Sequence, residues 1–181
     1  SRTIANGNQQ KALGRMFQRA TLLEWRTAIE NVLLPVEIQR SVTAADKARA
    51  AELLAMVGLN EAPTTLIDDL GVGKQQLVEI AKALSIDARI LIMDEPCAAL
   101  GPAETRMVLE TIKRLKAEGI GIFLISHDIH DVFDLSDRIS VMYHGRIVDT
   151  VNKADVTPDD VLGMIILGKK PDEVTEKDKA A

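Results

Sequence analysis

The sequence predicts an α/β fold in which a parallel sheet is flanked by helices and accompanied by a helical subdomain. Two short apolar runs have the length of strands, 89–93 and 120–126, and an amphipathic helix over 104–118 separates them. Continuous apolar strands joined through a helix are typical of a parallel sheet whose two faces are covered. The first half of the chain instead shows mainly helical spacing of its apolar residues.

The helical half begins with apolar residues at helical spacing over 21–40, among which Trp25 is expected to be an apolar anchor. A second helix is predicted over 43–57, because Thr43 can cap its first turn and an apolar face follows. A third helix is predicted over 74–85, directly after two glycines. These helices should form a subdomain of their own.

Beyond the second apolar run, the pattern returns to short elements. A short helix is expected over 131–136, and two strands, 138–143 and 146–151, flank a His-Gly pair that is typical of a hairpin turn. A last amphipathic helix should end at Gly168. The charged tail, 171–181, is expected to be disordered.

Composition excludes several classes of protein. The net charge is −5 and no basic run is longer than Lys169-Lys170, so the chain has no electrostatic footprint for nucleic acid. The single cysteine, Cys97, cannot form an internal disulfide, which favours a reducing compartment. No apolar run approaches the roughly 20 residues that span a bilayer, and the start of the chain lacks the apolar core of a signal peptide. We therefore expect a cytoplasmic protein.

Three chemically active side chains follow the two apolar strands. ILIMDEP ends in Asp94 and Glu95, and LISHD places His127 after the next strand. The carboxyl ends of parallel strands meet at one edge, where ligands bind. Each motif alone is more typical of a helix-start turn or of a surface histidine, but together they favour Mg²⁺-assisted phosphate chemistry. One acid would hold the metal through a water and the other would orient or deprotonate the attacking water.

These motifs belong to a series that resembles the ATP-binding cassette of ABC transporters. ILIMDEP looks like the Walker B strand with its catalytic glutamate, and LISHD looks like the switch-histidine motif. LGVGKQQLVEIAKAL, 70–84, is similar to the signature helix, AALG, 98–101, to the D-loop, and MFQR, 16–19, to the Q-loop. The motifs occur in the family's order over about residues 10–170. The resemblance implies an incomplete cassette related to P-loop NTPases.

The resemblance implies ATP and Mg²⁺ as cofactors and gives each motif a role. It places Glu95 and His127 in catalysis, and Gln18 and Asp94 at the metal. The nucleotide would be bound by residues of the Q-loop, signature and D-loop: Gln18, Gly71, Val72, Gly73, Lys74 and Gly101. The N–H groups at a helix start favour anions, and in the family this helix contacts the γ-phosphate of ATP held by the other subunit.

The resemblance also implies partners and a division of the chain. The expected partners are a second cassette, as a homodimer or heterodimer, a transmembrane permease subunit and, indirectly, a solute-binding protein, so the protein should be peripheral on the inner face of the cell membrane. The segment 1–20 would be a remnant of the ATPase core with the Q-loop, and 21–84 would be the helical subdomain ending in the signature helix. The α/β core with Walker B, D-loop and switch histidine would be 85–170.

The chain departs from the family's pattern at several positions. No P-loop, G-x-x-x-x-G-K-S/T, precedes Gln18; GMIILGKK fits part of this pattern, but lysine replaces the hydroxyl residue and the run follows the last motif. Gly71 stands where the family usually has serine, Lys74 where it has glutamine, and Gly101 where it has aspartate or threonine. The family's activity is ATP hydrolysis, and the sequence leaves open whether this chain performs it.

Two branches of the family are recognisable. The stretch from MFQR to about Ile38 resembles ATPases of oxoanion and sulfonate importers, whereas the longer part from Gln75 resembles those of simple-sugar importers. The leading hypothesis is therefore an ATP-binding subunit, or a fragment of one, that drives solute uptake, with sugar as the favoured solute. The alternative is a catalytically inactive cassette remnant that acts as an interaction module. A DNA-repair type of cassette is disfavoured, because the segment before the signature is short and has no sustained heptads.

Overall fold

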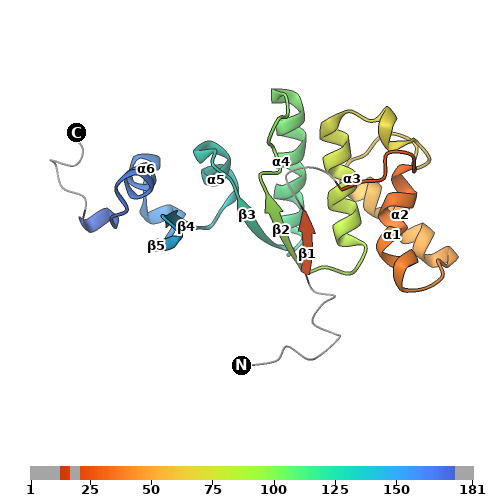
Figure 1. Ribbon diagram of the computed structural model, residues 1–181, viewed down its shortest axis with the longest axis horizontal. Helices are drawn as coiled ribbons and strands as arrows, with labels where there is room; N and C mark the ends of the chain where they lie inside the picture. The colour runs from red at the N-terminus through yellow and green to blue at the C-terminus, as the bar shows by residue number, and fades with distance from the viewer. Residues whose placement is uncertain (1–12, 17–20, 174–181) are drawn as a thin grey trace. The chain divides into compact units, whose positions relative to one another are not determined.

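The computed structural model describes residues 13–16 and 21–173, and Figure 1 shows the order of the helices and strands. The chain divides into two compact units, Ser1–Ser126 and His127–Ala181. Among the described residues, no helix combines the length and the apolar character that crossing a bilayer requires.

The first unit holds the strands and helices that precede Ser126. Its described elements are β1 (Leu13–Met16), α1 (Ala28–Gln39), α2 (Ala44–Met56), a 3-10 turn (Ile67–Asp69), α3 (Val72–Leu84), β2 (Ile90–Asp94), α4 (Pro102–Ala117) and β3 (Gly121–Ile125). The second unit contains α5 (Ile129–Leu135), β4 (Arg138–Tyr143), β5 (Arg146–Asn152), a 3-10 turn (Lys153–Asp155), α6 (Pro158–Leu167) and a last 3-10 turn (Pro171–Glu173).

The sheet of the first unit is parallel, in the order β1, β2, β3. Leu13 pairs with Ile90 and Ile90 pairs with Gly121, so the three strands begin in register. The predicted parallel α/β architecture is thereby confirmed. Strand β1 was not predicted, because its four residues alternate between exposed and buried and do not form a continuous apolar run.

One face of this sheet is closed by helices. Met16, Leu91 and Met93 are buried, and α3 and α4 contact β1 and β3 respectively. A Cβ atom on Gly14 would lie 2.6 Å from Leu91 Cδ2 and 3.0 Å from the Ala83 carbonyl oxygen, so glycine permits the close approach of α3 to β1. Helix α3 lies between the strands and the helices α1 and α2 (Figure 1).

The opposite face of the sheet carries apolar side chains that the described residues of the first unit leave exposed. Leu13, Ile90, Phe123 and Ile125 are between 39% and 59% exposed. Parallel sheets usually have both faces covered. The expectation of a sheet covered on both sides is therefore met on one face within this unit.

The first helix begins later than predicted, and Trp25 is not the expected anchor. Thr27 caps α1 through a capping box: the Glu30 N–H donates to Thr27 Oγ1, and Glu30 Oε2 accepts from the Thr27 N–H at 2.8 Å. Trp25 therefore precedes the helix and is 75% exposed. The prediction for the second helix is confirmed, since Thr43 caps α2 in the same way with Asp46.

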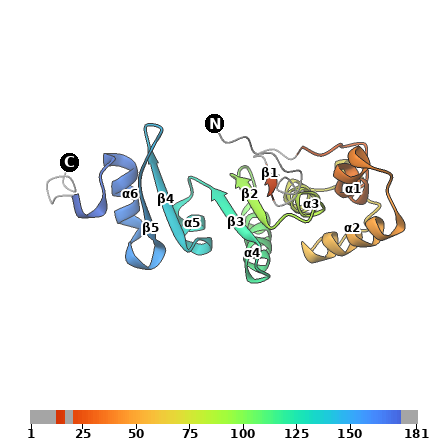
Figure 2. The ribbon, with the colours of Figure 1, turned by 90° about the horizontal axis from the view of Figure 1, so that it is seen from below.

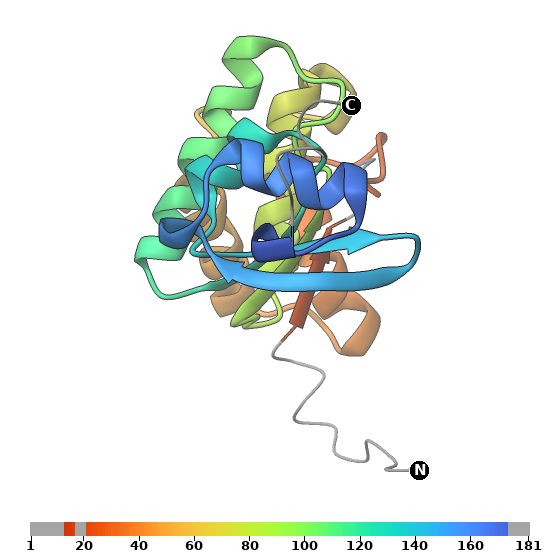
Figure 3. The ribbon, with the colours of Figure 1, turned by 90° about the vertical axis from the view of Figure 1, so that its left-hand side faces the viewer.

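The second unit is a hairpin with helices, as predicted. Strands β4 and β5 form an antiparallel pair, and α6 packs against β4 (Figures 2 and 3). His144 and Gly145 have positive φ angles of 47° and 78°, which is the geometry that two-residue hairpin turns need. A small core lies between the hairpin and α6, made of Ile139, Val141, Val161 and Met164.

The first residues of the predicted tail are described by the structure. A 3-10 turn, Pro171–Glu173, follows α6, and the Lys170 N–H donates to Glu173 Oε2 at 3.1 Å. The rest of the predicted tail, 174–181, lies outside the described residues.

Gly168 ends α6 as predicted, and its replacement by alanine is expected to lower the free energy of unfolding by about 2 kcal/mol. Gly168 adopts a left-handed conformation, with φ of 65°, and a Cβ atom there would lie 2.5 Å from Tyr143 Cδ1. The measurement is urea unfolding monitored by circular dichroism. Gly163→Ala in the same helix is the matched control, because its Cβ would meet nothing within 4 Å. The control should stabilise the helix by up to about 1 kcal/mol, and a loss of stability in both variants would contradict this explanation.

Candidate functional site

The predicted acidic pair lies at the carboxyl end of the central strand. Strand β2 ends at Asp94, which pairs with Ile125 of β3. The Glu95 N–H donates to the Ile125 carbonyl oxygen at 2.9 Å, so the backbone of the pair is fixed by the end of the neighbouring strand. This position is the edge where ligands of parallel α/β sheets bind.

The loop after the acidic pair has an unusual backbone. Glu95 has a φ of 49° and Ala99 a φ of 62°, although neither residue is glycine. Two turns hold the loop, with the Ala98 N–H donating to Glu95 O at 3.0 Å and the Leu100 N–H donating to Cys97 O at 3.2 Å. Left-handed non-glycine residues cost about 1–3 kcal/mol each and cluster at functional sites. The strain therefore coincides with the residues that the sequence had singled out.

The glycine segment of the predicted signature begins α3. Gly71 is the N-cap residue, and its carbonyl oxygen accepts from the N–H groups of Lys74 and Gln75 at 2.9 and 3.0 Å. Val72 is half exposed. The helix thus begins at Val72, two residues earlier than predicted, and its first turn includes the predicted residues Gly73 and Lys74.

Lys74 forms an ion pair with Glu61. The sequence had left open whether Lys74 contacts phosphate or faces solvent. The hydrogen bond from Lys74 is the main cause that lowers the pKa of Glu61 below its ordinary value. A carboxylate with a lowered pKa stabilises the fold above its ordinary pKa, and this contribution is lost as the pH falls through the lowered value. The Lys74 ammonium group is thus held by an acid of the same chain.

The starts of α3 and α4 are joined by a residue that sequence reasoning missed. Glu104 Oε1 accepts from the Gly73 N–H at 3.3 Å, and Glu104 Oε2 accepts from the Gly101 N–H at 3.1 Å. Gly101 is the N-cap residue of α4 and Glu104 is its third helical residue. A glutamate at this position is a capping signal that the sequence did carry. Two of the predicted site segments are therefore brought together by one carboxylate.

A second unpredicted cluster ties α3 to Thr21. Glu79 is only 3% exposed and accepts a hydrogen bond from Thr21 Oγ1 at 2.7 Å. Lys82 lies 3.4 Å from Glu79 and donates to the Thr21 carbonyl oxygen at 2.9 Å. Thr21 directly follows residues 17–20, so the cluster holds the chain next to the predicted Q-loop. Gln18 itself lies outside the described residues.

His127 is the first residue of the second unit, whereas the acidic pair belongs to the first. The next residue, Asp128, caps α5 and accepts from the His130 and Asp131 N–H groups at 2.8 and 3.2 Å. Within the described ranges, no group of three or more His, Cys, Asp or Glu side chains is arranged to hold a metal ion.

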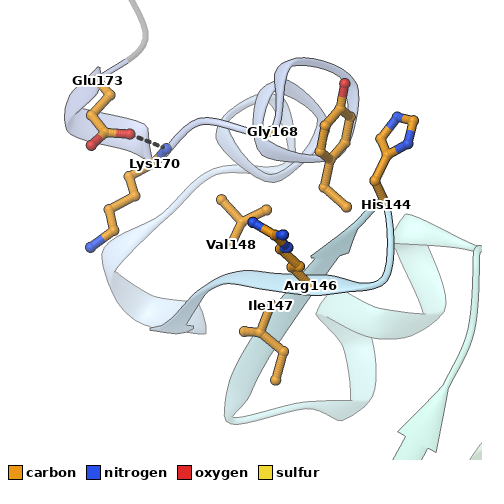
Figure 4. A pocket seen from close by; sticks show the side chains of 8 residues that line it. His144, Arg146, Ile147, Val148, Gly168, Lys170 and Glu173 are labelled. Carbon is orange, nitrogen blue, oxygen red and sulfur yellow. Dashed lines mark hydrogen bonds between the residues drawn. The ribbon is translucent and has the colours of Figure 1, made fainter.

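The second unit has a surface depression of about 500 Å³ on the side of the hairpin turn (Figure 4). His144, Arg146, Lys170 and Glu173 line it together with apolar residues. Its lining contains none of the residues that the sequence predicted for a site.

Comparison with known proteins gives one family and many relatives. The family described as "ABC transporter" matches residues 3–98. "Xylose import ATP-binding protein XylG" of Photobacterium profundum is 40% identical over 170 residues, which cover 91% of this chain and 33% of that protein. "Ribose import ATP-binding protein RbsA 1" of Rubrobacter xylanophilus is 39% identical over 168 residues, covering 90% of this chain and 34% of that protein. The chain thus spans about a third of the length of these curated relatives.

Solved structures give the same fold. A dimeric, post-hydrolysis state of the ATP-binding cassette MJ0796 bound to ADP and Pi matches with a TM-score of 0.68 and 26% identity, covering 83% of this chain and 68% of that chain. The protein cbiO1 from Clostridium perfringens, part of the ABC transporter complex cbiONQ, matches with a TM-score of 0.74 and 23% identity, covering 86% of this chain and 63% of that chain. The second likeness concerns the fold alone.

Proposed function

Because this chain belongs to the ABC transporter family, we propose that it is the ATP-binding subunit, or a part of one, of an importer that couples ATP binding and hydrolysis to the uptake of a sugar. The sugar is proposed because relatives about 40% identical are named for the import of xylose and ribose. The observation that carries the proposal is the acidic pair fixed at the carboxyl edge of the sheet.

The cofactors proposed for this site are ATP and Mg²⁺, and the donor groups of the chain suit both. Mg²⁺ is usually held by one or two carboxylates together with phosphate oxygens and water, and Asp94 supplies a carboxylate at the end of β2. Helix α3 begins at Val72, and the positive end of its dipole at this N-terminus favours phosphate. Bound Mg²⁺ would neutralise charge on the phosphate groups.

Each predicted residue keeps its proposed role. Glu95 would act as the general base and accept a proton from the attacking water. His127 would be the switch histidine of the catalytic site. Asp94 and Gln18 would hold the metal. The nucleotide contacts would come from the Q-loop, signature and D-loop residues: Gln18, Gly71, Val72, Gly73, Lys74 and Gly101.

The proposed partners follow from the same site. The starts of α3 and α4 would face a second cassette, identical or related, with nucleotide between the two. The segment 21–84 would be the helical subdomain that couples to a transmembrane permease, and 85–170 the α/β core. A solute-binding protein would act indirectly, and the protein would lie at the inner face of the cell membrane.

An inactive interaction module is the second candidate, and specific observations favour it. The family's serine hydroxyl is absent at Gly71, and the Lys74 ammonium is held by Glu61. Such a module would pair with an intact cassette without hydrolysing ATP.

Thermal unfolding with and without Mg²⁺-ATP separates the two candidates. If the chain binds ATP, a nucleotide concentration of 100 times Kd should stabilise it by about 2.7 kcal/mol and raise Tm by several degrees. Mg²⁺ with AMP is the control, because AMP lacks the β- and γ-phosphates. An unchanged Tm with Mg²⁺-ATP would contradict the ATP-binding proposal and leave the interaction module.

A further inference from the structure

We propose that Glu104 is a positioning residue that holds the start of α3 and the start of α4 together as one surface. The role in presenting this surface to a second cassette rests on the function proposed above. Glu104 belongs to none of the predicted nucleotide-binding motifs, and its contact with Gly73 joins residues that lie 31 positions apart in the chain.

The first observation is that one carboxylate serves two helix starts. Oε1 accepts from the Gly73 N–H at 3.3 Å and Oε2 accepts from the Gly101 N–H at 3.1 Å. N–H groups at the start of a helix have no partner inside the helix, and a carboxylate accepts strongly from them. Because each oxygen has its own donor, Glu104 joins the two segments directly.

The second observation is that packing fixes the stem of Glu104. A Cβ atom on Gly73 would lie 2.7 Å from Glu104 Cβ and 3.0 Å from its Cγ, so α3 touches Glu104 there only because residue 73 is glycine. Met107 Cε would lie 3.2 Å from the same Cβ position. Glu104 is half-buried at this contact. The carboxylate is thus placed by close packing as well as by its hydrogen bonds.

The consequence is a shared geometry for two of the predicted nucleotide-binding segments. A change in the position of Gly101 is passed to Gly73 through the Glu104 side chain, and the reverse also holds. If both segments meet the same partner, the link reduces the entropy that is lost when they are ordered together.

Hydrogen exchange of the Gly73 and Gly101 amides tests the link. In Glu104→Ala both amides should exchange about tenfold faster, as expected when a hydrogen bond is removed. Glu110→Ala is the control, because Glu110 is exposed on the same helix. Glu104→Gln keeps the stem but offers only one acceptor oxygen, so one of the two amides should retain its protection. Unchanged exchange at both amides in Glu104→Ala and Glu104→Gln would overturn the link.

Nucleotide-driven association, measured by sedimentation with Mg²⁺-ATP, tests the positioning role. We expect Glu104→Ala to weaken association at least about fivefold while Glu110→Ala leaves it unchanged. Unchanged or stronger association in Glu104→Ala would overturn the positioning role. Stronger association is the result expected if the Glu104 carboxylate only competes with phosphate for the same N–H groups. If the unsubstituted protein does not associate with nucleotide, the proposed function fails, and amide exchange still decides whether Glu104 joins the two helices.

Discussion

Replacing Glu95 with glutamine is expected to reduce ATP turnover at least about a hundredfold while leaving nucleotide-driven association intact. Glutamine has nearly the same shape as glutamate but cannot accept the proton of an attacking water. The backbone of Glu95 is held by its hydrogen bond to Ile125 and by the turn to Ala98, and neither contact involves the side chain. The substitution therefore keeps these two backbone contacts while it removes the proton acceptor.

The measurement is steady-state phosphate release together with sedimentation, in a form of the protein that carries a P-loop. Glu118→Gln, at an exposed position after α4, is the matched control and should leave both readouts unchanged. Unchanged turnover in Glu95→Gln would remove Glu95 from the role of general base. A parallel loss of turnover and association would instead assign it a structural role.

Removing the buried carboxylate of Glu79 is expected to have the largest effect on stability. Glu79→Ala should lower the free energy of unfolding by about 3 kcal/mol, because it takes away the acceptor of a buried network. Thr21 Oγ1 would lose its acceptor at 2.7 Å, and Lys82, whose side chain is only 16% exposed, would lose its counter-ion. The start of the described segment after residues 17–20 would then be held less firmly to α3.

Urea unfolding measures this change, and the chain provides a close control. Arg49 and Glu52 form an ion pair with the same spacing in sequence and the same 3.4 Å separation as Lys82 and Glu79, but both side chains are at least half exposed. Exposed pairs contribute little, so Glu52→Ala should change stability only slightly. If the two substitutions had equal effects, burial would not be the reason for the importance of Glu79.

Much of the fold could be predicted because local signals carry it. The apolar runs fixed β2 and β3, and the capping threonine and the His-Gly pair located α2 and the hairpin turn. The first helix was misplaced because Trp25 fits helical spacing, although the pair Thr27 and Glu30 carried the correct start. Strand β1 was not predicted because only every second residue of LGRM is buried, so the strand has no continuous apolar run.

The candidate site was predictable only in part. Asp94 and Glu95 stand at the strand end that the sequence indicated. Their proposed roles, and those of the glycine segments, remain predictions. The links through Glu104 and Glu79 depend on contacts between residues 31 and 58 positions apart, which no local pattern specifies. Tertiary packing, and not the motifs, creates these two contacts.

The uncovered face of the sheet has a consequence for handling the protein. Leu13, Ile90, Phe123 and Ile125 present apolar side chains on neighbouring strands of the first unit. Contiguous apolar surface of this kind lowers colloidal stability, and the modest net charge of −5 supplies little repulsion between molecules. Where nothing outside the described part of the first unit covers this face, concentrated solutions should aggregate, most of all near the isoelectric point of about 5.3.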